Sequence, residues 1–195
     1  TGRGNDCIKR VDAFSIEQLS KEFFTKYEQH YLAFVDYLIQ SKFKISAFNG
    51  DEKAIRDFVK KTLGRIVFLY FLQKKGWLGA SDNDYSDGDK DFMQTFWDAS
   101  GQSETFFSLH LCRLFFEGLN TPLKTKEMFK MPNGKMVKIP YLNGGLFDKD
   151  RDEPDYLTFP PKLFNSLFSF FSEYNFTIDE NDPEEHEVGI DPEML

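Results

Sequence analysis

The chain has 195 residues, of which 41% are hydrophobic and 17% aromatic, including 23 Phe. This apolar content is too high for a disordered chain, and the length corresponds to one large domain or to a domain with appendages. The net charge of −8 and the isoelectric point near 5.0 argue against a free-standing nucleic-acid binder. The two cysteines, Cys7 and Cys112, provide neither a disulfide framework nor metal-ligand spacing.

The charge is unevenly distributed along the chain. Residues 148–195 hold 14 acidic and 3 basic residues, whereas residues 42–75 hold 9 basic and 3 acidic residues. The basic segment leaves two interpretations open, a solvated helix face or a surface that contacts phosphate groups. Because the chain begins at Thr1 and no apolar signal segment follows, we expect a fragment of a cytoplasmic protein.

The first elements expected are a polar tail and a long helix. Residues 1–10 are polar and are expected to be a disordered tail or the remnant of a linker. Residues 15–18, Ser-Ile-Glu-Gln, have the form of a capping box and predict a helix from there to about Gln40. One side of this helix is apolar, and its members are Leu19, Phe23, Tyr27, Tyr31, Phe34 and Leu38.

Residues 56–78 are predicted to form a central helix around which the other elements pack. Apolar residues recur at i, i+3 and i+4 in its first half, and its second half is apolar on all faces. Asp51 is the expected N-cap, and Gly76 is expected to end the helix in the left-handed conformation. The uncharged run 66–72 is far shorter than the roughly 20 residues that a membrane-spanning helix needs, so a core helix is predicted.

An Asp-rich segment and two shorter helices are expected next. Residues 81–91 do not fit a calcium loop, because the position that requires Gly is Asp87. The first short helix should turn Phe92, Met93, Phe96 and Trp97 inward. The second should begin at Ser103 and end at Gly118, with His110 on its apolar face, where a hydrogen-bonded core histidine is favoured over a ligand.

The last third of the chain contains a hairpin, a glycine-containing loop and a final helix. Asn133-Gly134 predicts a hairpin with a two-residue loop at about 128–139. Asn143, Gly144 and Gly145 predict a tight loop, for which a structural role is favoured over ligand binding. Thr158 is the expected cap of a helix, and residues 179–195 are an acidic segment. The fold class is therefore mainly α, a multi-helix bundle-like domain at 11–178 with one small β-hairpin.

Sequence motifs for catalysis are absent. The sequence has no Gly-rich phosphate loop, no Cys/His cluster and no Gly-x-Ser-x-Gly elbow. Residues 51–53, Asp-Glu-Lys, have the residue types of a metal-dependent nuclease, but they lie at a helix start with no strand before it. Residues 159–162, Phe-Pro-Pro-Lys, differ from an amino-methyltransferase loop at both ends, because that loop needs a hydrogen-bonding residue first and a stacking aromatic ring last. We therefore assign no catalytic, cofactor-binding or metal-binding residue.

Several stretches, taken in order, resemble a known family. They are residues 14–24 (FSIEQLSKEFF), 72–78 (LQKKGWL), 140–147 (PYLNGGLF), 174–180 (YNFTIDE) and 190–195 (IDPEML). From residue 11 to the end, the chain resembles the helical region of single-chain type IIG or IIS restriction–modification enzymes, with relatives in phage-defence adenine methyltransferases.

The resemblance implies a role rather than an active site. In that family a Mg²⁺-dependent nuclease is followed by a helical connector and then by a methyltransferase that uses S-adenosylmethionine on the N6 of adenine. The chain would be the connector, with 179–195 leading into the methyltransferase, with double-stranded DNA as partner, and with both cofactors bound elsewhere in the parent enzyme. Contacts to the DNA backbone would come from Arg56, Lys60, Lys61, Arg65, Lys74 and Lys75, with Lys135 and Lys138 as second candidates. The alternative is an independent helical protein-interaction module.

Overall fold

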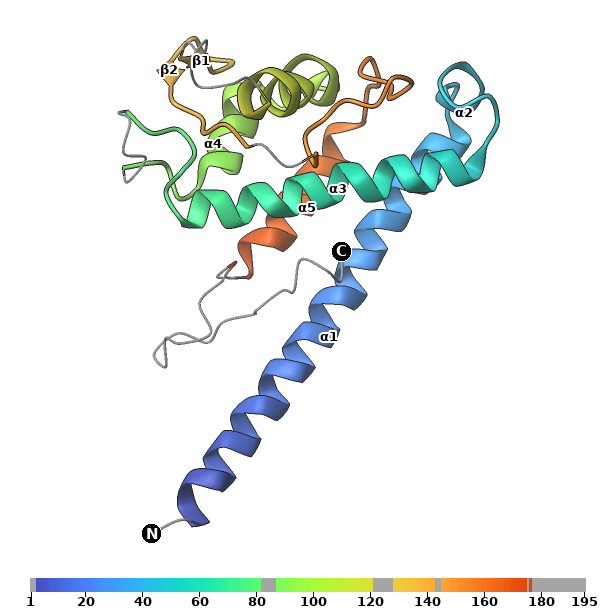
Figure 1. Ribbon diagram of the computed structural model, residues 1–195. Helices are drawn as coiled ribbons and strands as arrows, with labels where there is room; N and C mark the ends of the chain where they lie inside the picture. The colour runs from blue at the N-terminus through green and yellow to red at the C-terminus, as the bar shows by residue number, and fades with distance from the viewer. Residues whose placement is uncertain (1–2, 82–86, 121–127, 143–144, 175, 177–195) are drawn as a thin grey trace.

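The computed structural model describes residues 3–81, 87–120, 128–142, 145–174 and 176, and the side chains of helix α1 from residue 21 onward. This part of the chain is mainly helical with one small antiparallel sheet, which confirms the predicted fold class (Figure 1). The elements are the α-helices α1 (Arg3–Gln40), α2 (Phe43–Ser46), α3 (Glu52–Lys74), α4 (Phe92–Ala99) and α5 (Pro161–Ser172), the π-helices η1 (Phe106–Leu111) and η2 (Leu114–Leu119), and the strands β1 (Phe129–Lys130) and β2 (Met136–Val137).

Helix α1 is longer than the sequence predicts. It has 38 residues, so its length is about 57 Å at 1.5 Å per residue, and its N-terminal half extends away from the other helices (Figure 1). The predicted start at the capping box of Ser15 is therefore wrong for the described backbone, and α1 also includes residues 3–10 of the segment expected to be a tail or the remnant of a linker. No proline interrupts this stretch, so the helix continues through Ser15 to Arg3.

Helix α3 forms the centre of the domain, as predicted. The Asp51 side chain accepts hydrogen bonds from the backbone N–H groups of Lys53 (2.8 Å) and Ala54 (3.1 Å), which satisfies two donors that the helix itself leaves free. At the other end, Gly76 has φ +72°, and the Trp77 N–H donates to the Leu72 carbonyl at 3.1 Å. Both predicted ends of the helix are confirmed, the second as a glycine stop.

The core is a continuous cluster of aromatic and aliphatic side chains. Helix α3 packs against α1 and α4, and α1 also packs against α5. The ring centroid of Phe164 in α5 lies 5.2 Å from that of Phe34 in α1 and 5.0 Å from that of Phe106 in η1, and both contacts are edge-to-face. The only described polar link to the buried Trp97 indole is Asn165, whose Oδ1 accepts from Nε1 at 2.7 Å. The edge-to-face contacts of Phe164 favour particular ring orientations and so help to fix the angles between α5 and the helices that it contacts.

The helix predicted at 103–118 is a pair of π-helices instead. Ser103 does not cap it, because its hydroxyl pairs with that of Thr105 at 3.0 Å. Apolar spacing alone does not distinguish an i→i+5 hydrogen-bond pattern from an α-helix. His110 is half-buried against the rings of Phe96 and Phe106 rather than in the core, and burial lowers the pKa of its imidazole.

The hairpin lies where it was predicted, but its loop has three residues. Phe129 pairs with Val137, and the Met131 N–H donates to the Lys135 carbonyl at 2.8 Å. Pro132 suits the second position of a type I turn, and Gly134 at φ +86° follows in the left-handed conformation. The hairpin is joined to the segment that follows α3, because Ala80 and Lys138 form an antiparallel bridge.

Helix α5 begins at Pro161, later than predicted from Thr158. A residue that precedes proline disfavours the helical conformation, and Pro160 is accordingly extended, with ψ 134°. The Thr158 carbonyl accepts a hydrogen bond from the Tyr37 hydroxyl at 2.9 Å instead. Residues 82–86, Asn143, Gly144 and the acidic segment 179–195 lie outside the described residues.

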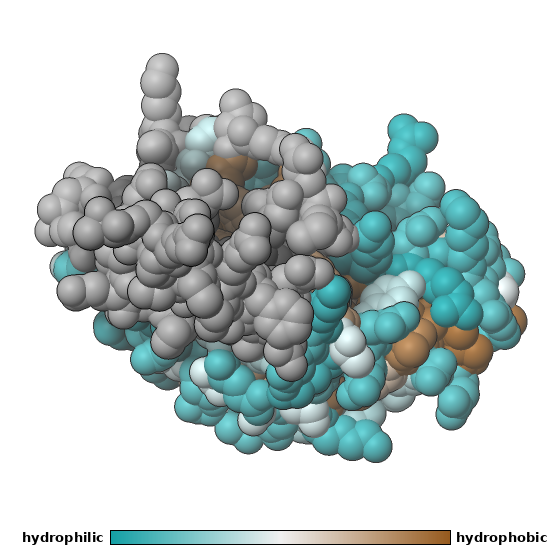
Figure 2. All heavy atoms as spheres, turned by 90° about the horizontal axis from the view of Figure 1, so that it is seen from below, coloured by the Kyte–Doolittle hydropathy of each residue, from teal (hydrophilic) through white to brown (hydrophobic). Residues whose placement is uncertain are grey.

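The surface seen from below is mainly hydrophilic where the structure describes it (Figure 2). An apolar patch stands out on the side where α2 lies, and Ile45 of that helix is 67% exposed. No helix in the described ranges is long and apolar enough to cross a membrane.

Candidate functional site

The basic residues predicted to contact DNA lie in different environments along α3. Arg56 and Lys60 are exposed and lie one turn apart, and neither forms an ion pair with a described residue. Lys74 is half-buried and Lys75 exposed, and Lys75 lies 15 residues after Lys60, or roughly 22 Å along the axis. The six predicted residues therefore do not form one continuous strip.

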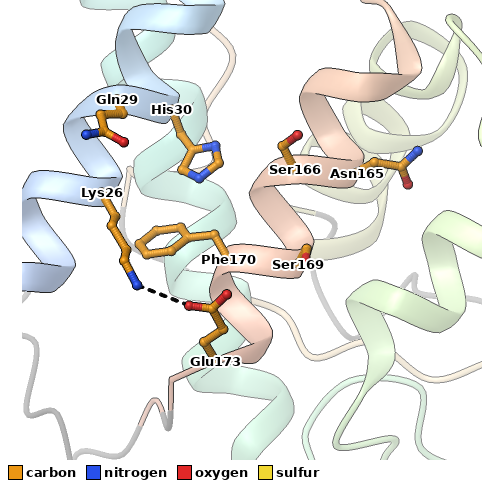
Figure 3. Close-up of a pocket in the computed structure, with 8 residues that line it drawn as sticks. All are labelled: Lys26, Gln29, His30, Asn165, Ser166, Ser169, Phe170 and Glu173. Atoms are coloured by element: carbon orange, nitrogen blue, oxygen red, sulfur yellow. Dashed lines mark hydrogen bonds and ion pairs between the residues drawn. The ribbon is translucent and has the colours of Figure 1, made fainter.

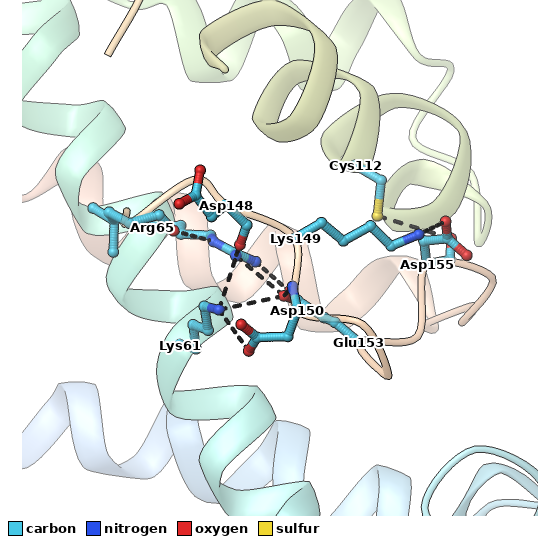
Figure 4. A network of polar contacts seen from close by, with 9 residues as sticks. Lys61, Arg65, Cys112, Asp148, Lys149, Asp150, Glu153 and Asp155 are labelled. Carbon is cyan, nitrogen blue, oxygen red and sulfur yellow. Dashed lines mark hydrogen bonds and ion pairs between the residues drawn. The ribbon is translucent and has the colours of Figure 1, made fainter. Parts of the chain in front are cut away.

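Arg65 is buried, which corrects the prediction that it contacts DNA. It is 1% exposed, its Nε donates to the Leu146 carbonyl at 2.7 Å and its Nη2 donates to the Asp148 carbonyl at 2.8 Å. Both Nη atoms also donate to the carboxylate of Glu153, which is 5% exposed (Figure 4). Because each of its three guanidinium nitrogens donates to one or more of these partners, Arg65 is a structural residue and not a surface charge.

Aromatic rings complete the environment of Arg65. Its guanidinium carbon lies 5.4 Å from the ring centroid of Phe115 and 5.1 Å from that of Phe116. A guanidinium is stabilised over an aromatic face more effectively when water is excluded. The charge therefore links three parts of the chain, namely α3, η2 and the segment 145–153.

Lys61 is half-buried beside the same network. Its Nζ lies 2.7 Å from Asp150 Oδ2 and 3.5 Å from Glu153 Oε2. The hydrogen bond from Lys61 is the main reason that the pKa of Asp150 lies below its usual value. Any phosphate that approached Lys61 would compete with these carboxylates, so Arg56 and Lys60 are the more available positions.

The predicted glycine-containing loop is fixed to α3 where the structure describes it. Gly145 has φ +75°, a conformation that favours glycine. Directly after it, the carbonyls of Leu146 and Asp148 accept from Arg65. These contacts explain a structural role for the described part of the loop, and the roles of Asn143 and Gly144 stay predictions.

A groove lies on the exposed side of α3 and is called the α3 groove below. Its volume is about 340 Å³, and its lining residues are Asp57, Lys60, Lys61, Gly64, Val67, Phe68, Phe71 and Leu146. The charged residues belong to the first turns and the apolar ones to the later turns and to the loop. A Cβ atom built on Gly64 would meet no heavy atom within 4 Å, so the middle of the groove is open.

A second, polar pocket of about 510 Å³ lies between α1 and α5 (Figure 3). Lys26 on α1 and Glu173, directly after α5, form an ion pair of 3.3 Å across it. The imidazole of His30 stacks on the ring of Phe170, with 4.9 Å between the centroids. Burial lowers the pKa of His30, so its neutral form is favoured near pH 7. The sequence analysis missed this pocket because its residues lie on the polar sides of two helices far apart in the sequence.

The described residues offer little that would hold a metal or act as a nucleophile. Within the described ranges, no group of three or more His, Cys, Asp or Glu could hold a metal ion. Burial raises the pKa of the Cys112 thiol to about 12, so this thiol is protonated at neutral pH and poorly nucleophilic.

Comparison with known proteins links the chain to restriction–modification enzymes. Over 153 residues, or 75% of this chain, it is 28% identical to a protein of Methanocaldococcus jannaschii that is provisionally named a type II restriction enzyme and methyltransferase. The matched part is 12% of the length of that relative. No protein-family profile and no solved structure matches the chain. The resemblance to the enzyme family is thus supported by an independent comparison.

Proposed function

We propose that this chain is a non-catalytic helical part of a type II restriction–modification enzyme. In this proposal it joins an N-terminal endonuclease to a C-terminal S-adenosylmethionine-dependent adenine-N6 DNA methyltransferase in the cytoplasm. The observation that carries the proposal is the similarity to the archaeal relative, because the chain corresponds to a small share of a much longer protein. The ordered family-like stretches of the sequence support the same assignment.

A connector must hold two catalytic domains at a fixed distance, and the described elements suit that task. The core that joins α1, α3 and α5 is rich in interlocked rings, and close packing of this kind makes a domain rigid. The ion pair between Arg65 and Glu153 ties a long loop to the central helix. Helix α1 adds a rod that projects from this body (Figure 1).

The proposal assigns both cofactors to the flanking domains. S-adenosylmethionine would bind in the methyltransferase and Mg²⁺ in the nuclease. The test is to read the coding sequence on both sides of this segment. A carboxylate–Lys nuclease set upstream and an Asn/Asp-Pro-Pro-aromatic motif downstream are expected. A parent gene that encodes neither domain would overturn the proposal.

Contacts to the DNA backbone are proposed for Arg56 and Lys60, with Lys74 and Lys75 as a second pair. Each phosphate contact adds about 0.9 to the slope of log K against log salt concentration. In the parent enzyme, the double variant Arg56→Gln/Lys60→Gln should therefore lower that slope by about 1.8. Lys53→Gln is the control, because Lys53 is exposed but pairs with Asp57 at 3.2 Å. An unchanged slope in the double variant would exclude these contacts.

An independent protein-interaction module is the second candidate. The apolar patch on the side of α2, where Ile45 is largely exposed, favours it (Figure 2). This function predicts a stable complex between the isolated chain and another protein. A chain that stays monomeric at high concentration and binds no partner would count against it.

A further inference from the structure

We propose that the acidic C-terminal segment, residues 177–195, docks in the α3 groove of the same chain. The groove is an apolar surface with a basic edge, and nothing described in the structure covers it. The inference concerns contacts within the chain and holds whether or not the parent enzyme binds DNA through this domain.

The first argument is the position at which the described chain ends. Phe176 is 1% exposed, and its ring centroid lies 5.4 Å from that of Phe71 and 5.1 Å from that of Tyr70. Phe71 also lines the α3 groove. The segment that follows Phe176 therefore starts beside the apolar end of the groove.

The second argument is length. The groove runs from Phe71 to Asp57, 14 residues earlier on α3, which is about 21 Å along a helix. The segment 177–195 has 19 residues and spans about 60 Å when extended. It is long enough to cross the groove with residues to spare, even if much of it is not extended.

The third argument is chemical complementarity. Residues 177–195 contain eight acidic residues and no Lys or Arg, together with apolar residues such as Ile178 and Val188. The edge of the groove carries Lys60, which forms no ion pair with a described residue, and the exposed Arg56 lies one turn before it. Acidic side chains can thus pair with this edge while an apolar side chain covers Val67, Phe68 or Leu146.

Gly64 provides the space for such a segment. It lies in the middle of α3, where glycine lowers helix stability by roughly 1 kcal/mol relative to alanine. No described atom would clash with a Cβ at this position, so packing within the described fold does not explain the glycine. The absence of a Cβ lets a second backbone approach the helix closely. Docking would also fix the direction in which the chain leaves the domain.

The test is cross-linking of chain 1–195 by a carbodiimide, which condenses a carboxylate and a lysine amine in contact into an amide. Peptide mass spectrometry should find residues 177–195 joined to Lys60 or Lys61. Cross-linking between Lys61 and Asp150, which lie 2.7 Å apart, serves as the internal positive control. A mixture of ¹⁵N-labelled and unlabelled chains distinguishes contacts within one chain from contacts between copies.

Filling the groove should abolish the contact. Gly64→Leu should lower the yield of these cross-links about tenfold, which corresponds to a loss of ~1.4 kcal/mol. Ser169→Leu, an exposed substitution in the other pocket, is the matched control and should leave them unchanged. If Gly64→Leu unfolds the chain in circular dichroism, Leu146→Ser replaces it, because the Leu146 side chain is exposed and lines the groove.

Several outcomes would overturn the proposal. The first is that the control cross-link forms while none joins 177–195 to Lys60 or Lys61. The second is that the segment joins mainly to Lys26, Lys74 or Lys75. The third is that its cross-links form only between copies, or persist at full yield when the groove is filled.

Discussion

Breaking the ion pair between Arg65 and Glu153 should destabilise the fold strongly. The two side chains are 1% and 5% exposed, so neither charge is solvated by bulk water. Glu153→Gln preserves the shape of the side chain but leaves the Arg65 guanidinium without its counter-charge. Removing one partner of a buried pair costs about 3–5 kcal/mol, because the other charge stays buried and uncompensated.

The assay is chemical and thermal unfolding of chain 1–195. A loss of about 3 kcal/mol should lower the melting temperature by roughly 6–12 °C for a chain of this size. The urea midpoint should fall while the dependence on urea concentration stays the same, because the surface exposed on unfolding does not change.

A double-mutant cycle separates the ion pair from other effects. Arg65→Met combined with Glu153→Gln leaves no charge unpaired, so the double variant should lose at least about 1 kcal/mol less than the sum of the single variants. Asp57→Asn is the control, because its partner Lys53 is 86% exposed, and it should cost less than about 0.5 kcal/mol. If Glu153→Gln costs no more than Asp57→Asn, the structural role assigned to Arg65 is refuted.

Three further predictions use the same unfolding assay. Gly79→Ala should destabilise the chain, because Gly79 has φ +73° and a Cβ there would lie 2.9 Å from the Phe92 ring; an unchanged stability would contradict this. Asp51→Ala should cost about 1 kcal/mol through the lost helix cap, and no loss would show that water replaces it. Because burial lowers the pKa of His30 below 6.5, the unfolded chain binds its proton more readily, so stability present above pH 6.5 should decline as the pH falls below that value. His30→Gln should flatten this decline, and an unchanged profile would assign it to other groups.

The contrast between Lys60 and Arg65 explains why the candidate site was only partly predictable. Both are basic residues on one helix, five positions apart, and the sequence analysis treated them alike. Lys60 lies on the solvent side, whereas Arg65 is enclosed by carbonyls and a carboxylate more than 80 residues away in the sequence. Helical periodicity could have warned of this, because Arg65 lies seven residues after Phe58 and four before Leu69, on the same side of the helix, and both of these residues are buried.

The hairpin was also predicted only in part, in its position but not in the length of its loop. Its position was predicted because Asn133-Gly134 is a local turn signal. Its loop length was not, because Pro132 also takes part and shifts the turn by one residue. The start of α5 was likewise predicted too early, at Thr158, because Pro160 is held in an extended conformation by the proline that follows it.

By itself, the sequence determined the class of fold, the two ends of α3, the inward faces of α3 and α4, and the resemblance to restriction–modification enzymes. These features depend on residues within a few positions of one another, so local hydrogen bonding and periodicity decide them. Only the tertiary structure decided which basic residue of α3 is buried and where the α3 groove lies. It also decided that Phe176, the last described residue, lies beside that groove. Those features depend on segments that meet only after the chain folds, and no local pattern encodes which distant groups will surround a side chain.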